Sequence, residues 1–157
     1  MKVEIWSDVV CPFCYIGKRK FEKALEGFEA KEKVEIVWRS FQLDPEMEYV
    51  PGQSVHEYLG KRKGGSAAEG KRMNDANAPR AKEGGLEYDF DKAIITNTLD
   101  AHRLIHLAKE YGLQGQMKER LFKAYYTEGK NVGDIDTLVQ LGEEVGLPSD
   151  TVRSMLQ

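Results

Sequence analysis

The chain has 157 residues, of which 41% are hydrophobic and 31% charged, and its formal net charge is −3. This length suits one domain with a substantial core, and the composition excludes a mostly disordered chain. With no bilayer-length apolar run, no secretory signal and an acidic balance, the sequence favours a cytoplasmic protein without nucleic acid or membrane as a partner.

The chain begins with the pattern of a strand, a helix and a second strand. Apolar and polar residues alternate over residues 2–9, which predicts a strand. Helical spacing starts at Pro12, whose missing N–H would have no partner in a first turn. Alternation returns over residues 34–40. Because the connection is long, we expect a right-handed βαβ unit with parallel strands.

After this unit the pattern is helical. Two serine–glutamate pairs with capping-box spacing predict helix starts. The pairs are Ser54 with Glu57 and Ser66 with Glu69. The second of these helices is expected over residues 66–83. Three more helical patterns follow, each ended by a glycine, and Ser149 is expected to cap a last helix. We therefore divide the chain into the N-terminal βαβ part of the core, residues 1–45, and a helical insertion, residues 46–157.

Both cysteines of the chain lie in one motif, Cys11-Pro12-Phe13-Cys14, at the predicted helix start. A bridge across a single turn would stabilise the fold little, because it closes a very short loop. Free N–H groups and the helix dipole stabilise a thiolate at this place, and the spacing brings the second sulfur close to the first. The motif predicts thiol–disulfide exchange with Cys11 as the nucleophile and Cys14 as the resolving residue.

Other residues near the motif carry less specific predictions. Asp8 is expected to cap the turn, with proton transfer from the resolving thiol as the alternative. Trp6 and Trp38 are expected in the core, and Trp6 could report optically on the dithiol. His102 is expected to be a satisfied core or boundary histidine rather than a catalytic one. The basic run Lys18–Lys20 is expected on a solvated helix face.

A zinc-binding interaction module without enzymatic activity is an alternative use of the cysteines. His102 and His106 stand four residues apart and could complete a set of two cysteines and two histidines. More than half of the chain separates the two pairs, however, whereas zinc modules hold them roughly a dozen residues apart. No metal site is therefore predicted.

The motif and three further stretches resemble a known family. The stretches are Trp6-Ser7-Asp8, Phe41-Gln42-Leu43-Asp44-Pro45, and Asn97-Thr98 with Ala101-His102-Arg103-Leu104. Together with Cys11 to Gly17 they resemble the cytoplasmic FrnE-like branch of the DsbA-like thioredoxin family, over essentially the entire chain. The resemblance implies an α/β thioredoxin-like fold with a helical insertion after the first βαβ unit. It also implies disulfide exchange with thiol proteins or glutathione, no cofactor, and a substrate region near Asn97 and His102.

The resemblance leaves a second activity open. Related members are 2-hydroxychromene-2-carboxylate isomerases and kappa-class glutathione transferases, whose motif has serine where this chain has Cys11. Retention of both cysteines favours redox chemistry. Family members also continue into two antiparallel strands and a helix, preceded by a cis-proline that no proline here matches. We therefore expect the C-terminal half of the core to be missing, and a homo-oligomer could cover the exposed sheet edge.

Overall fold

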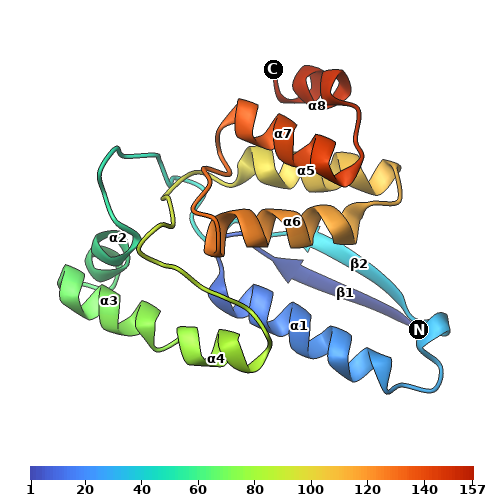
Figure 1. Ribbon diagram of the computed structural model, residues 1–157, viewed down its shortest axis with the longest axis horizontal. Coiled ribbons are helices and arrows are strands. Elements are labelled where there is room, and N and C mark those ends of the chain that lie inside the picture. The colour runs from blue at the N-terminus through green and yellow to red at the C-terminus, as the bar shows by residue number, and fades with distance from the viewer.

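The computed structural model describes residues 1–157 as a two-stranded sheet surrounded by helices (Figure 1). The strands β1 (Lys2–Ser7) and β2 (Glu35–Ser40) run parallel, and α1 (Pro12–Glu26) and a 3-10 turn (Lys31–Lys33) join them. The predicted βαβ unit is confirmed, with ends that differ by at most two residues. Since α1 begins shortly after β1 ends, the dithiol motif lies at the carboxyl edge of the sheet.

The rest of the chain is helical and forms two groups (Figure 1). The helices are α2 (Val55–Arg62), α3 (Ala67–Asp75), α4 (Ala78–Glu83), α5 (Leu99–Glu110), α6 (Gln114–Tyr126), α7 (Ile135–Val145) and α8 (Ser149–Leu156). Helix α2 packs on α3, while α5, α6, α7 and α8 pack on one another, and α6 also contacts α1. No helix is both long and apolar enough to cross a membrane. The division of the chain after residue 45 remains a prediction.

One predicted helix is divided in two. Residues 66–83, expected as a single helix, form α3 and α4 with a break at Ala76 and Asn77. Pro79 has no N–H to donate to the carbonyl of Asp75, and its ring would crowd that carbonyl. The chain therefore restarts as a new helix with the proline in its first turn, where proline is tolerated.

The helix starts confirm two of the predicted serine caps and correct a third. Ser54 caps α2, and Ser66 caps α3 in a reciprocal box with Glu69. Ser149 is instead the first residue within α8 and follows Pro148, which offers no side-chain cap. Two of the three predicted serine caps therefore had the right local chemistry.

The two tryptophans lie in different environments. Trp38 is buried, but Trp6 is 61% exposed, so the prediction that Trp6 belongs to the core is wrong. Side chains alternate along a strand, and in β1 Ile5 and Ser7 point to the covered face. Trp6 shares the opposite face with Glu4 and stays accessible to solvent. The alternation of side chains along the strand therefore places Trp6 on the exposed face, although its side chain is apolar.

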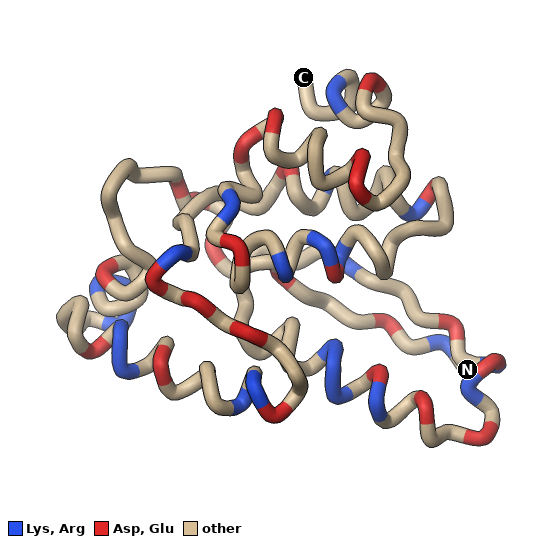
Figure 2. The backbone as a smooth tube through the Cα atoms, viewed as in Figure 1, with Lys and Arg blue, Asp and Glu red and all other residues tan.

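Charge is distributed along most elements of the fold (Figure 2). Lysine and arginine alternate with aspartate and glutamate on the helices, and acidic residues gather on the segment between α4 and α5. Phosphate binding by a protein needs clustered positive charge. This interspersed pattern gives no support to a nucleic-acid partner.

Candidate active site

The two cysteines bracket the first turn of α1. Cys11 is the N-cap residue with an extended backbone, at φ −93° and ψ 110°, and Pro12 is the first helical residue. The Cys14 N–H donates to the Cys11 carbonyl at 3.0 Å. Both cysteines are free thiols of intermediate exposure, and Phe13 between them is 57% exposed. The turn is therefore open to a reaction partner from solvent.

The two thiols interact through a hydrogen bond, which moves their pKa values in opposite directions. A hydrogen bond from the Cys11 thiol lowers the pKa of Cys14 to about 6, against the opposing effect of burial. The backbone of Asp8, the hydroxyl of Ser7 and the charge of Lys118 lower it further. The same hydrogen bond and burial raise the pKa of Cys11 far above that of a free thiol. The two sulfurs are therefore close enough to share one negative charge in the reduced chain, and the assignment of Cys11 as the nucleophile stays a prediction.

Asp8 is buried behind this turn and joins three parts of the chain. Its carboxylate accepts hydrogen bonds from the N–H groups of Val9 and Leu43, both at 2.7 Å, and its Oδ1 lies 3.0 Å from His102 Nε2. Burial acts to raise the pKa of Asp8, but hydrogen bonds from His102, Leu43 and Thr98 hold it below its usual value. The bond from Val9 fits the capping role, and proton transfer from the resolving thiol stays a prediction.

The two residues assigned to the substrate region have partners within the chain. The Asn97 amide donates to the carbonyls of Pro45 at 2.8 Å and Met47 at 3.1 Å, and its oxygen accepts from the Leu99 N–H at 2.9 Å. Asn97 thereby fixes the start of α5 to the loop after β2. His102 is buried, and its Nδ1 has no partner. A substrate-binding role for either residue stays a prediction.

The histidines do not assemble with the cysteines. His102 is held by Asp8, and His106 Nε2 lies 2.9 Å from the Ser40 hydroxyl. No group of three or more His, Cys, Asp and Glu side chains is arranged to hold a metal ion. The geometry therefore offers no observation in favour of the zinc module.

Tyr88 is a site residue that the sequence reasoning missed. Its hydroxyl donates to the Pro12 carbonyl at 2.7 Å, which ties the dithiol turn to the segment before α5. Its ring stacks on Tyr126 with centroids 4.3 Å apart, and Tyr126 is fully buried. Nothing in the local sequence marks Tyr88, because its partner lies 76 residues away.

Lys118 is the second residue that was missed. It lies in α6 and is only 1% exposed, and its Nζ is 3.4 Å from the carbonyl oxygen of Ser7. A signal for its burial was present in the sequence. Leu121 and Phe122, three and four residues later, are apolar and mark the inward stripe of the helix, and Lys118 stands on that stripe.

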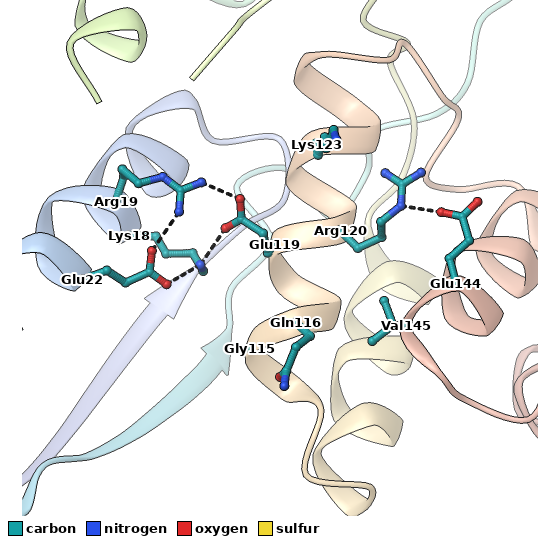
Figure 3. Close-up of a pocket in the computed structure, with 10 residues that line it drawn as sticks. All are labelled: Lys18, Arg19, Glu22, Gly115, Gln116, Glu119, Arg120, Lys123, Glu144 and Val145. Atoms are coloured by element: carbon teal, nitrogen blue, oxygen red, sulfur yellow. Dashed lines mark hydrogen bonds and ion pairs between the residues drawn. The ribbon is translucent and has the colours of Figure 1, made fainter. Parts of the chain in front are cut away.

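A groove of about 740 Å³ lies away from the dithiol, between α1, α6 and the end of α7 (Figure 3). Glu119 pairs with Lys18 at 2.6 Å and also with Arg19, and Arg120 pairs with Glu144 at 2.6 Å. Lys18 is 5% exposed, so the prediction that the basic run is solvated is wrong for this residue. Because these charges are paired with one another, the groove is better explained as a contact between helices held by ion pairs than as a ligand-binding site.

Comparison with known proteins identifies the family to which this fold belongs. Residues 2–157 match the model of the DSBA-like thioredoxin domain. The chain belongs to the DsbA-like thioredoxin family. It is 32% identical over 160 residues to the uncharacterized protein YwbO of Bacillus subtilis (strain 168), which covers 99% of this chain and 71% of YwbO. The thioredoxin-like fold predicted from the sequence is thereby confirmed.

Solved structures agree with this DsbA-like assignment. A probable DsbA oxidoreductase from Streptomyces coelicolor is 38% identical and superposes with a TM-score of 0.92, over 99% of this chain and 67% of that chain. The cytosolic disulfide reductase DsbM from Pseudomonas aeruginosa, solved with GSH, shares the fold at 18% identity. Its TM-score is 0.66, over 99% of this chain and 70% of DsbM. Membership of the FrnE-like branch stays a prediction.

Proposed function

We propose that this DsbA-like chain is a thiol–disulfide oxidoreductase that exchanges a Cys11–Cys14 disulfide with thiols of proteins or small molecules. The observation that carries the proposal is the pair of free thiols at the first turn of α1, with the pKa of Cys14 lowered to about 6. The thiolate is the reactive form of cysteine. A pair of cysteines that carries one negative charge at neutral pH is therefore suited to disulfide exchange.

The two sulfurs take different roles in the proposed reaction. Cys14 packs against the apolar core, whereas Cys11 caps the helix outside it. A substrate thiolate attacks the sulfur of Cys11, the bond between Cys11 and Cys14 breaks, and Cys14 leaves as a thiolate. The low pKa of Cys14 makes it a good leaving group.

The second half of the reaction completes the transfer of two electrons. A second substrate thiolate attacks the substrate sulfur of the mixed disulfide, and the bond to Cys11 breaks. Cys11 leaves as a thiolate, and the reduced pair of cysteines takes up one proton. The substrate is oxidised to a disulfide and the cysteine pair is reduced. In the reverse direction Cys11 attacks a substrate disulfide after its proton passes to Cys14.

Glutathione and a cytoplasmic location are part of the proposal. DsbM, which shares the fold, is described as a cytosolic disulfide reductase and was solved with GSH. A small thiol of this kind needs only an accessible sulfur at the motif, which the intermediate exposure of Cys11 supplies. The physiological substrate and the direction of electron flow depend on the reduction potential.

Trapping the mixed disulfide tests the proposal. Wild-type protein equilibrated in glutathione buffers of varied ratio is expected to show a reversible two-electron couple. Cys14→Ser is expected to accumulate one glutathione on Cys11, seen by mass spectrometry, because the resolving thiol is gone. Cys11→Ser is the matched control and should form far less adduct. Absence of a reversible couple, or of an adduct in Cys14→Ser, would contradict the proposal.

A second variant distinguishes the proposed redox activity from the alternative, a glutathione-dependent isomerase or transferase. Redox exchange cannot survive in Cys11→Ser combined with Cys14→Ala, whereas isomerisation could use the new serine hydroxyl. Turnover of a hydroxychromene carboxylate by this double variant would favour the isomerase. Loss of all activity in the double variant is the result expected here.

A further inference from the structure

One side chain from outside the motif is hydrogen-bonded to the dithiol turn. The Tyr88 hydroxyl donates to the carbonyl of Pro12, the residue after Cys11, at 2.7 Å. Cys11 begins α1 without a side-chain cap, and Phe13 is 57% exposed. No other side chain from outside the motif forms a hydrogen bond with the backbone of residues 11–14. Tyr88 is therefore the one polar side chain through which the rest of the fold holds this backbone.

Aromatic neighbours fix the ring of Tyr88. The ring stacks on that of Tyr126, with centroids 4.3 Å apart and 19° between the planes. Phe90 meets the Tyr88 ring edge-on, with centroids 5.5 Å apart. Stacked and edge-to-face pairs are the favoured geometries of aromatic side chains. Tyr126 belongs to α6 and is 1% exposed, so the Tyr88 ring rests on a buried support and cannot easily turn its hydroxyl away from Pro12.

The backbone on either side of Tyr88 is attached to the same helix. The N–H of Asp89 donates to the Tyr126 carbonyl at 2.7 Å. The Thr127 hydroxyl donates to the Glu87 carbonyl, also at 2.7 Å. Both partners lie at the C-terminal end of α6, which packs on α1. The ring of Tyr88 and both of its chain neighbours therefore connect the dithiol turn to α6, although the segment itself is irregular.

A fixed turn matters for exchange because the step that closes the disulfide is intramolecular. When a substrate disulfide is reduced, Cys11 first forms a mixed disulfide with one substrate sulfur, and the other sulfur leaves. The thiolate of Cys14 then attacks the sulfur of Cys11, the bond from Cys11 to the substrate breaks, and the substrate leaves as a thiolate. The substrate gains two electrons and the cysteine pair loses two. The rate of the second step depends on how closely the two cysteines are held.

We propose that Tyr88 is a positioning residue for disulfide exchange, because its hydrogen bond to the Pro12 carbonyl holds the first turn of α1 in the geometry from which Cys11 and Cys14 join. This inference rests on the proposed function. In the reduced protein no covalent bond links the two sulfurs. A turn that is already ordered loses less conformational freedom when the disulfide forms. Tyr88 therefore favours the disulfide and speeds the release of the substrate from Cys11.

Removing the Tyr88 hydroxyl tests this role. Tyr88→Phe keeps the ring and its stacking and removes only the hydrogen bond to Pro12. Tyr58→Phe is the matched control, because Tyr58 also packs against the core and its hydroxyl donates to Asp44, outside the dithiol turn. A loss of stability alone should affect both variants alike. The fraction reduced is measured in glutathione buffers, and the mixed disulfide is followed by acid quenching and mass spectrometry after reduced protein meets glutathione disulfide.

The expected changes correspond to part of the contribution of one hydrogen bond. In Tyr88→Phe the equilibrium with glutathione should move about threefold toward the dithiol, and the mixed disulfide should persist about threefold longer. Tyr58→Phe should match the wild type in both measurements. Equal values in the two variants, with the wild type cycling normally, would overturn this inference alone. A wild type without a reversible couple would overturn the proposed function itself.

A measurement on the unmodified protein keeps the test valid if Tyr88→Phe fails to fold. If the turn is ordered before the disulfide forms, its amide hydrogens should exchange slowly in the reduced protein as well as in the oxidised one. The probe is the Cys14 N–H, which donates to the Cys11 carbonyl at 3.0 Å. Hydrogen exchange followed by NMR should give protection within about tenfold between the two states. Unprotected exchange of this N–H in the reduced protein would overturn the inference.

Discussion

At the scale of single residues, the site depends on buried charges that are neutralised within the chain. Asp8 is 1% exposed, and its two oxygens accept hydrogen bonds from two backbone N–H groups and contact His102. These bonds lower the pKa of Asp8. A group with a lowered pKa stabilises the fold at neutral pH, and this stability is lost as the pH falls below about 4.

Removing the Asp8 carboxylate should therefore destabilise the protein. Asp8→Ala leaves His102 and the Leu43 N–H without a partner in the interior, which should lower the free energy of unfolding by about 3 kcal/mol. Urea unfolding at pH 7 measures the change. Asp100→Ala, which breaks the surface pair with Arg103, should cost less than about 1 kcal/mol. Similar losses in the two variants would show that Asp8 is not a buried anchor.

At the scale of elements, the parts of the fold that depend on near neighbours could be predicted from the sequence. The βαβ unit, the caps of α2 and α3, and the position of Cys11 and Cys14 at a helix start all follow from patterns within a few residues. The break at Pro79 also had a local signal, but the capping box and the residues after it favoured one continuous helix.

The rest of the site depends on contacts between distant elements. The hydrogen bond from Lys118 to Ser7 joins residues 111 apart in the sequence, and the one from Tyr88 to Pro12 joins residues 76 apart. Periodicity shows that Lys118 is on the inward stripe of α6, but not which element faces that stripe.

The end of α7 allows a prediction on one element. Gly146 ends this helix with φ +105°, a conformation that costs residues with a Cβ roughly 1–2 kcal/mol. A Cβ there would meet only Leu113 Cδ1 at 3.9 Å, so backbone strain is the sole penalty. Gly146→Ala should lower the free energy of unfolding by that amount.

Gly115→Ala is the control for Gly146→Ala. Gly115 lies within α6, and a Cβ there meets no atom within 4 Å. Alanine should stabilise this position by about 0.5–1 kcal/mol, because it reduces the freedom of the unfolded chain. Thermal unfolding followed by circular dichroism should therefore shift in opposite directions for the two variants. Shifts of the same sign would contradict the strain argument.

At the scale of the whole molecule, the dithiol and Lys118 couple the reactive site to the stability of the fold. Cys14 has a folded pKa of about 6 against an ordinary value of 9.0, so between pH 6 and 9 the unfolded chain binds a proton that the folded chain has lost. Stability then rises with pH. Lys118, with a folded pKa of about 8 against 10.5, continues the rise above pH 8. Both effects have the same sign in this window.

We therefore expect the reduced protein to gain stability from pH 6 to pH 9, by up to about 1.4 kcal/mol per pH unit for each proton. Urea unfolding with a reducing agent present measures this slope at several pH values. Combining Cys14→Ala with Lys118→Met should flatten the curve, because both groups that release a proton on folding are gone. The raised pKa of Cys11 acts only above pH 9, where its unfolded thiol ionises and the folded one does not. A flat curve in the wild type would mean that the folded protein does not hold a thiolate at neutral pH, and the order of bond breaking proposed for the two cysteines would then fail.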